Sequence, residues 1–372
     1  MNPINEERLL KEFLEFVQID SESGNEKAMG QRLCEVLKDL GLEPITDEAG
    51  KTYHSNGFNV FARFPGEGEP MVLSAHMDTV VPGNGVKPVI KDGVIYSDGT
   101  TILGGDDKSG ICGILEAVRV IQENNLPHRP AEIIFSIGEE GGMRGAKAFD
   151  CSQLKSKRAY IFDSSGEVGK VIVGAPGQIK VFADVVGRRA HAGLAPEEGI
   201  SAIQVMAKAI AKMNLLRIDA ETTCNIGTIK AEYATNIVPD RCSIIAEVRS
   251  RNFDKLNAQA EHIRQCLQEA CDEAGATLEW NPVTNYVSYN IPEDSAIVTD
   301  LLSCIEKIGR EKLVTLGGGG SDANIYNQKG IQAVVLGTGM TKVHTTSESI
   351  KIVNLNDTAR LALALLTMEA AR

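Results

Sequence analysis

The spacing of apolar residues along the chain predicts alternating helices and strands. Near the start, apolar side chains recur at three- and four-residue intervals, which predicts helices over about 5–17 and 26–40. Shorter apolar runs predict strands over 59–63, 71–75, 132–137 and 159–162, with a hairpin turn at 91–93 and a helix over about 108–123. Strands that alternate with helices predict an α/β fold built on a buried sheet.

The order of the elements changes after the segment 173–177, which is rich in glycine and proline. The predicted elements are then strand 178–186, helix 199–213, strands 224–231 and 241–249, helix 255–274 and strand 277–281. This βαββαβ order is that of a ferredoxin-like domain. The first pattern returns with helix 294–308, strand 333–336 and a final helix over about 355–371. We therefore predict a discontinuous main domain, 1–174 and 287–372, with a smaller domain inserted at 175–286.

Charge and cysteine content narrow the class of protein. With 38 basic and 50 acidic residues the net charge is −12, which argues against nucleic acid or an anionic membrane as a partner. No segment reaches the ~20 apolar residues that span a bilayer, and the polar, acidic N-terminus does not resemble a secretory signal. The eight cysteines are scattered without a CxxC pair. We expect a reduced, cytoplasmic protein.

Side chains that bind metals cluster at the ends of predicted elements. They are His76 and Asp78, Asp106 and Asp107, Glu139 and Glu140, and Asp163. Taken singly, each has a simpler interpretation, namely a hydrogen-bonded structural histidine, a helix cap or a solvated loop. Ligands of open α/β sheets bind outside the carboxyl ends of the strands, so we expect these groups to lie together. Acids so close repel one another, and a bound cation removes that repulsion.

The ordered set of motifs resembles a known family. The motifs are His76-Met77-Asp78-Thr79-Val80, Gly105-Asp106-Asp107-Lys108, Glu139-Glu140-Gly141, Asp163 and Val343-His344-Thr345. In this order they are similar to the co-catalytic zinc exopeptidases, which include peptidase T, carboxypeptidase G, aminoacylases and desuccinylases. The resemblance covers nearly the whole chain, and Asp106-Asp107-Lys108 with its flanking glycines is most similar to the peptidase T branch. It implies a zinc-exopeptidase-type α/β catalytic domain.

The resemblance also implies a site for two divalent ions, zinc first, with cobalt or manganese as alternatives. Its ligands would be Asp106 shared by both ions, His76 and Asp163 on one ion, and Glu140 and His344 on the other. Glu139 would be the general base that takes a proton from the attacking water and returns it to the leaving amine. Asp78 would hold the ring of His76 through a hydrogen bond. In the family, the peptide bond after the shared aspartate is often cis.

The inserted domain and one glycine-rich loop supply the expected substrate contacts. By resemblance, His191 would stabilise the oxyanion, often in the site of a partner subunit. Asn236 would contact the substrate and Arg249 would bind its carboxylate, a task that suits the guanidinium. Gly319 and Ser321 would line the pocket. Without the metal motifs these would be a surface histidine, a turn residue, an exposed strand end and a flexible loop. We expect Arg249 and Asn236 to face one pocket.

These inferences favour a dinuclear exopeptidase for short peptides, most of all a tripeptide aminopeptidase. Two alternatives remain. One is an N-acyl amino acid hydrolase, such as a deacylase or a carboxypeptidase, on the same scaffold. The other is an inactive metal-binding or interaction protein, although such a relative would usually lack Glu139 or a ligand. We expect the inserted domain to act as a lid or to form a homodimer interface, because the edge of its sheet is a ready contact surface.

Overall fold

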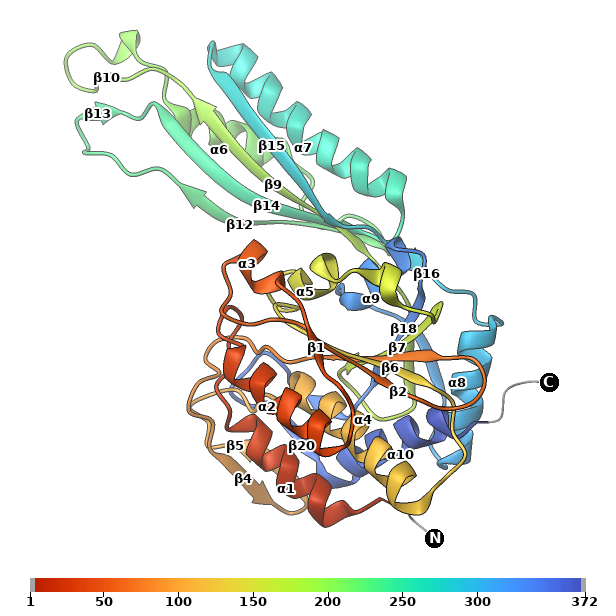
Figure 1. Cartoon of the computed structure of the whole chain (residues 1–372). Coiled ribbons are helices and arrows are strands. Elements are labelled where there is room, and N and C mark those ends of the chain that lie inside the picture. Colours follow the sequence, from red (N-terminus) through yellow and green to blue (C-terminus); the bar gives the residue numbers. More distant parts are fainter. Residues whose placement is uncertain (1–3, 369–372) are drawn as a thin grey trace. The chain divides into compact units, whose positions relative to one another are not determined.

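The computed structural model describes residues 4–368, which form two compact units. Unit 1 contains the chain up to Gly174, Asn290–Gly317, and the chain from Ser321 onward. Unit 2 contains Ala175–Tyr289 and the short segment Gly318–Gly320. Unit 2 is therefore an insertion in the chain of unit 1, and Figure 1 follows the chain through both by colour.

Unit 1 is built on a mixed sheet whose central strands are parallel. In spatial order the strands are β1 (Ile45–Thr46), β2 (Val60–Phe64), β6 (Ala131–Ser136), β3 (Met71–His76), β7 (Arg158–Ser164), β18 (Gln332–Gly337), β8 (Lys170–Ala175) and β16 (Tyr289–Asn290), with β17 (Leu313–Leu316) beside β8. Strand β3 pairs in parallel with β6 and β7, and β7 pairs in parallel with β18. The carboxyl ends of these strands consequently meet at one edge of the sheet.

Helices cover both faces of this sheet (Figure 1). One face carries α1 (Glu6–Val17), α2 (Lys27–Asp39), α4 (Gly105–Asn124), α8 (Ala296–Lys307) and α10 (Ile352–Leu366); the other carries α3 (Ala49–Tyr53), α5 (Arg144–Ala148) and α9 (Asp322–Gln328). Glycines let α4 sit deep in the core. A Cβ on Gly110 would lie 2.5 Å from the Phe162 carbonyl of β7, and one on Gly113 would lie 2.7 Å from Thr358 of α10.

A small second sheet completes unit 1. Its order is β19 (Met340–Thr341), β20 (Ser349–Lys351), β5 (Val94–Ser97) and β4 (Pro88–Lys91). The predicted turn at 91–93 joins β4 to β5 as an antiparallel hairpin, with Asp92 and Gly93 at positive φ. Strands β19 and β20 are joined by the loop 342–348, which carries His344. This sheet therefore links the loop of His344 to the segment that leads into α4.

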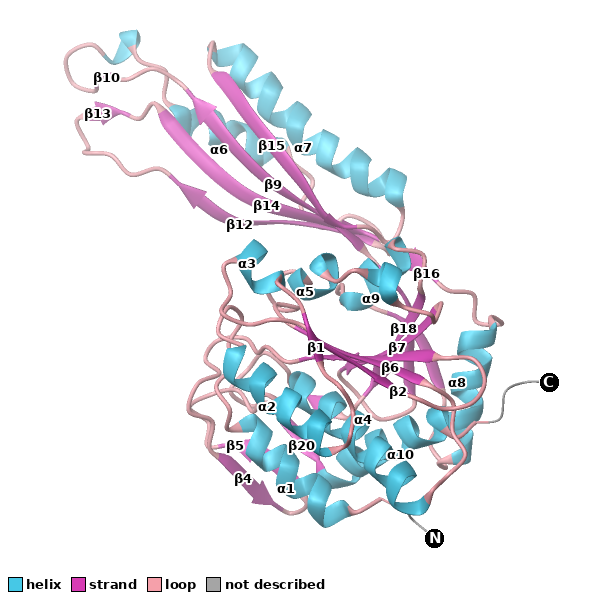
Figure 2. Cartoon of the chain, viewed as in Figure 1, coloured by secondary structure: helices cyan, strands magenta, loops and turns pink. Residues whose placement is uncertain are grey.

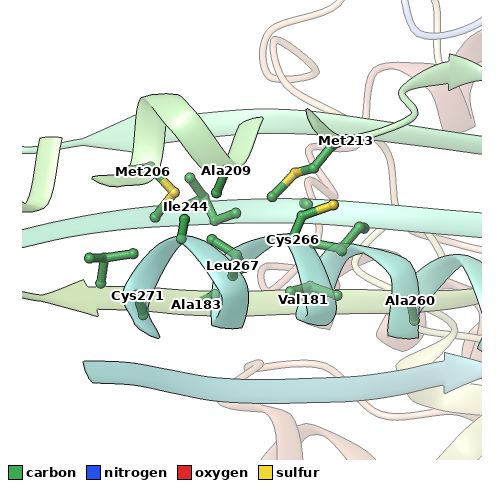
Figure 3. Packing of buried hydrophobic residues seen from close by; sticks show 14 of the residues in the cluster. Val181, Ala183, Met206, Ala209, Met213, Ile244, Ala260, Cys266, Leu267 and Cys271 are labelled. Carbon is green, nitrogen blue, oxygen red and sulfur yellow. The ribbon is translucent and has the colours of Figure 1, made fainter. Parts of the chain in front are cut away.

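Unit 2 has the βαββαβ order, and its two helices cover one face of its sheet (Figure 2). The elements are β9 (Gly177–Val186), α6 (Ala202–Lys212), β12 (Thr222–Lys230), β14 (Arg241–Ser250), α7 (Phe253–Ala274) and β15 (Thr277–Tyr286), and the antiparallel sheet has the order β11-β12-β14-β9-β15, where β11 is Leu216–Arg217. Alternate β9 residues such as Val181 and Ala183 point to the helices and pack against Met206 and Leu267 (Figure 3).

The element boundaries that differ from the predictions include the ends of β15 and α10 and the start of α4. Strand β15 continues to Tyr286 although it contains Pro282, because β15 is an edge strand that pairs only with β9 and tolerates a missing N–H donor. Helix α10 ends at Leu366 instead of continuing toward 371, and positions 369–371 lie outside the described residues. Helix α4 begins at Gly105 rather than at about 108, with non-helical backbone angles at Asp106 and Asp107.

All eight cysteines are free, and each is buried or half-buried. Among residues 4–368, no helix combines the length and the apolar character that crossing a membrane requires.

Candidate metal centre

The carboxyl edge of the unit 1 sheet brings the predicted ligands together. His76 is the last residue of β3, Asp163 lies near the end of β7, and Glu139 and Glu140 follow the end of β6. Since these three strands are parallel neighbours, their ends place the side chains side by side. Asp106 reaches the same place from the start of α4.

The carboxylate of Asp106 lies between the two histidines. Its Oδ1 is 3.2 Å from Nε2 of His76, and its Oδ2 is 3.3 Å from Nε2 of His344. His76 Nε2 also lies 3.6 Å from Asp163 Oδ1, while His344 Nε2 lies 2.8 Å from Glu140 Oε1. One oxygen of Asp106 thus faces the pair of His76 and Asp163, and the other faces the pair of His344 and Glu140. The peptide bond between Asp106 and Asp107 is cis, as the resemblance implied.

The crowding of buried acids shifts the titration of the cluster. Burial raises the pKa of Asp163 to about 7, and burial together with the charge of Asp163 raises the pKa of Glu139 well above its usual range. Contacts with Asp106 and Glu140 raise the pKa of His344 to about 10. Burial would lower the pKa of His76, but the charges around it, that of Asp163 first, raise the pKa well above 6.5. A positive charge nearby would therefore stabilise the ionised form of these buried carboxyl groups.

The donor set fits divalent metal ions. Ligand atoms of His76, Asp106 and Glu140 all lie within 4.8 Å of one another, and so do those of His76, Glu139 and Asp163. Imidazole nitrogens mixed with carboxylate oxygens suit zinc and similar first-row ions. The two groups of three share His76, and two cations there would balance the excess of buried carboxylates. The cluster is therefore a candidate dinuclear metal site.

Asp78 supports this cluster differently from what we expected. The closest partner of the His76 Nδ1 atom is the backbone carbonyl of Asp78, at 2.9 Å, whereas the Asp78 carboxylate is 3.5 Å away. That fully buried carboxylate accepts the backbone N–H groups of Glu139 and Glu140, at 2.9 and 3.2 Å, and the hydroxyl of Ser23 at 2.6 Å. Asp78 therefore fixes the loop that carries both glutamates.

Unit 2 separates the substrate residues that we expected in one pocket. Arg249 of β14 pairs with Gln178 at the start of β9, whereas Arg241, at the other end of β14, pairs with Val186 at the end of β9. Eight strand residues span about 26 Å. The two-stranded ribbon of β10 (Ala190–His191) and β13 (Ile237–Val238) extends from the Val186 end of β9 (Figure 1). Within one chain, Arg249 and Asn236 therefore do not face a common pocket, contrary to the expectation.

The two groups of unit 2 residues have different surroundings. His191 and Asn236 are exposed neighbours on this ribbon, where the Asn236 carbonyl accepts the N–H of Ala192. Arg249 is half-buried and forms a bidentate pair with Glu247, at 3.0 and 3.1 Å. A Cβ on Gly319 would lie 3.9 Å from Nη1 of Arg249, so that glycine borders the guanidinium. The ribbon of β10 and β13 and the Arg249 side chain are therefore two separate candidate contact points.

Ser321 has a structural task in unit 1. It is the N-cap of α9: its hydroxyl accepts the Ala323 N–H at 3.3 Å, and its own N–H is donated to the side chain of Asn324 at 3.0 Å. The next residue, Asp322, is buried and accepts the hydroxyl of Ser136 at 2.5 Å. Ser321 thus begins the helix beside the end of β6, and lining of the pocket by its hydroxyl stays a prediction.

One buried residue beside the site, Glu348, had no role assigned to it from the sequence. The carboxylate of Glu348 accepts backbone N–H groups of Leu103, Gly104 and Asp106. It follows His344 by four residues, but the sequence does not indicate its partners, which are more than 240 residues away in the chain. Only the fold brings it to the start of α4.

Comparison with known proteins identifies the family. The model of peptidase family M20/M25/M40 matches residues 72–368. The chain belongs to this family, which makes it a hydrolase of the metallopeptidase class.

Individual relatives align with this chain over almost its full length. The chain is 43% identical to the aminopeptidase PepT of Bacillus cereus, with a TM-score of 0.91 and coverage of 98% of this chain and 99% of that one. It is 40% identical to a tripeptidase of Staphylococcus aureus, with a TM-score of 0.94 and 98% coverage of both chains. It is 42% identical to the uncharacterized protein YqjE of Bacillus subtilis, over 99% of this chain and 100% of that protein.

Proposed function

We propose that this protein is a dinuclear aminopeptidase that releases the N-terminal residue from short peptides, tripeptides above all, with zinc as the first candidate ion. The observation that carries the proposal is the position of the Asp106 carboxylate. Its Oδ1 lies beside Nε2 of His76, and its Oδ2 lies beside Nε2 of His344. Two ions that share a carboxylate need this arrangement. The choice of peptide substrate is supported by the similarity to PepT of Bacillus cereus and to the Staphylococcus aureus tripeptidase.

In this proposal five side chains hold the two ions. Asp106 is shared, His76 and Asp163 complete one ion's ligands, and Glu140 and His344 complete the other's. When bound, the ions would polarise the scissile carbonyl and lower the pKa of the attacking water. Cobalt or manganese could replace zinc at such a site, because nitrogen and oxygen ligands accept all three.

Glu139 is the proposed general base. Its N–H is donated to Asp78, and its carboxylate lies within 4.8 Å of ligand atoms of His76 and Asp163. It would take a proton from the attacking water and deliver it to the leaving amine, so that one group serves as base and then as acid. Burial is the main cause of its raised pKa, and a raised pKa favours the protonated form that delivers the proton to the amine. Asp78 keeps the loop in place during both transfers.

We further propose that the active form is a homodimer. A tripeptide spans about 11 Å at most, whereas Arg249 and the ribbon of His191 lie toward opposite ends of the unit 2 sheet, and these ends are about 26 Å apart along β14. One chain therefore cannot supply both groups to the same short peptide. We assign Arg249 to the carboxylate of the substrate, and His191 with Asn236 to the site of the partner subunit, where His191 would stabilise the oxyanion. The eight free thiols favour a reducing compartment, the cytoplasm.

A substrate panel tests the activity. Metal-free protein is assayed with zinc, cobalt or manganese on dipeptides, tripeptides, N-terminally blocked tripeptides and N-acyl amino acids. We expect free tripeptides to be cleaved at the first bond and blocked ones to be spared, with two ions per chain by elemental analysis. Preference for N-acyl amino acids would favour the deacylase alternative. Two bound ions without any turnover would favour the binding protein.

Subunit mixing tests the dimer assignment. Light scattering should first give the mass of two chains. Glu139→Gln and His191→Ala homodimers, each of low activity, are then exchanged. If His191 serves the partner's site, a heterodimer has one site with both residues intact, and mixing restores about a quarter of wild-type activity. If His191 serves its own chain, mixing restores none. A monomer in solution would overturn the dimer proposal.

A further inference from the structure

The loop that carries His344 ends in a buried carboxylate, that of Glu348. The residue directly precedes β20 and is 1% exposed. Its own N–H is donated to the carbonyl of Thr345, which ties it to the residue after His344. The side chain points away from solvent, toward the start of α4.

Three backbone donors converge on this carboxylate. Oε2 accepts the N–H groups of Leu103 and Gly104, each at 2.8 Å, and Oε1 accepts the N–H of Asp106 at 2.9 Å. The first N–H groups of a helix have no partner within the helix and need one from outside. Helix α4 has Gly104 at its N-cap, which has no side chain to supply an acceptor. Glu348 provides that acceptor from a distant part of the chain.

The segment held in this way carries the shared carboxylate of the metal centre. Asp106 has φ −79° and ψ 102°, outside the helical region, so the helix itself does not fix its orientation. Its two oxygens must nevertheless lie 3.2 and 3.3 Å from Nε2 of His76 and of His344. Glu348 bonds to the N–H of Asp106 and belongs to the same loop as His344. It therefore connects the two chain segments on the His344 side of the site.

We infer that Glu348 is a positioning residue for the metal centre, which sets the Asp106 carboxylate relative to His344 so that the ion held by Asp106, Glu140 and His344 can bind. The inference rests on the proposed dinuclear function and extends it to a residue that contacts neither ion nor substrate. Hydrogen-bond partners that orient metal ligands commonly change metal affinity 10–100-fold when they are lost.

A matched control separates this role from general stabilisation. Glu132 at the start of β6 is 2% exposed, and its carboxylate also accepts backbone N–H groups, from Lys155 at 3.0 Å and Ser156 at 2.9 Å. It lies at the amino end of its strand, whereas the cluster lies at the carboxyl end. Replacement of either glutamate by glutamine puts an NH₂ group against backbone N–H donors, so both variants lose buried hydrogen bonds.

The experiment measures metal binding directly. Metal-free full-length wild type, Glu348→Gln and Glu132→Gln are titrated with zinc by calorimetry and with cobalt by visible absorption, and their melting temperatures are recorded. We expect both variants to melt below wild type. Only Glu348→Gln should bind the second ion at least about tenfold more weakly while it keeps the first. If Glu348→Gln does not fold, Glu348→Asp, which keeps the charge but retracts it by one methylene, is titrated with the same expectation.

The outcomes are distinct. Two ions bound by the folded Glu348 variant with wild-type affinities would overturn the positioning role and leave the dinuclear proposal intact. Equal loss of metal affinity in Glu348→Gln and Glu132→Gln would also overturn it, because the effect would then be one of general stability. Fewer than two ions in the wild type would overturn the dinuclear function and the inference with it.

Discussion

Replacement of Asp78 by asparagine tests whether the glutamate loop depends on one buried carboxylate. The two oxygens of Asp78 serve different donors: Oδ1 accepts the N–H of Glu139, and Oδ2 accepts the N–H of Glu140 and the hydroxyl of Ser23. Asparagine has nearly the same shape but only one acceptor oxygen. Whichever way the amide turns, its NH₂ group faces at least one backbone N–H.

The magnitude follows from these contacts. One buried N–H without a partner costs about 1–3 kcal/mol, and each remaining bond that loses its charged acceptor weakens by about 1 kcal/mol. We therefore expect the free energy of unfolding of unit 1 to fall by about 2–4 kcal/mol. For a domain of this size, that corresponds to a melting temperature lower by about 4–16 °C. Because Glu139 is on the loosened loop, kcat should also fall, by about 10–100-fold.

The assay compares wild type, Asp78→Asn and Glu132→Gln by thermal melting and by tripeptide turnover with saturating metal. Glu132→Gln also loses acceptors for backbone N–H groups, but away from the cluster, and should lower the melting temperature without a matching loss of kcat. If Asp78→Asn keeps the kcat of wild type, Asp78 does not hold the loop for catalysis. If the melting temperature of Asp78→Asn is also unchanged, the hydrogen bonds accepted by Asp78 do not contribute the stability assigned to them.

Three other predictions follow from the site. Glu139→Gln should bind two ions and melt like wild type, yet lose turnover by about 10²–10⁴-fold, and near-normal turnover would exclude Glu139 as the base. Arg249→Ala should lower kcat/KM for free-acid tripeptides by about 2–4 kcal/mol of transition-state free energy, and less for C-terminally amidated ones; equal losses would show that Arg249 does not read the carboxylate. In metal-free protein, the folded-state pKa values of Asp163, about 7, and His344, about 10, lie above their unfolded values. The folded state therefore binds more protons than the unfolded state between about pH 4 and pH 10, so the melting temperature of the metal-free protein should fall as pH rises across that range. Added zinc should raise the melting temperature most at the upper end of the range. A melting temperature that rises with pH would contradict this prediction.

Much of the site could be predicted because its residues follow local signals. His76 and Asp163 close apolar strands, and parallel strands bring their carboxyl ends together whatever the details of the loops. The order of motifs then identified the remaining groups. The same logic predicted the βαββαβ order of unit 2, since its strands alternate between buried and exposed residues, as β9 does.

What could not be predicted depends on contacts between distant segments. The turn at Gly105–Asp107, which precedes the regular part of α4, was not predicted, and it is held by Glu348 instead of by a neighbouring cap residue. The carboxylate of Asp78 bonds to the loop of Glu139, a choice that the HxD spacing does not determine. The separation of Arg249 from His191 follows from the length and register of β14, which the sequence pattern alone does not place.

The way the chain leaves and re-enters unit 1 makes unit 2 an exchangeable module. It leaves after β8 and returns at β16, and the N–H of Ile291 is donated to the carbonyl of Val173 at 2.6 Å. Both ends of the insertion are thus already held together by unit 1, so a longer or shorter insertion changes the entropy of closure only slowly, by about 0.6 kcal/mol per doubling of length. Every proposed metal ligand lies outside the insertion. Evolution could therefore graft a different insertion onto these two strands and change the accepted substrate while the hydrolytic centre stays as it is.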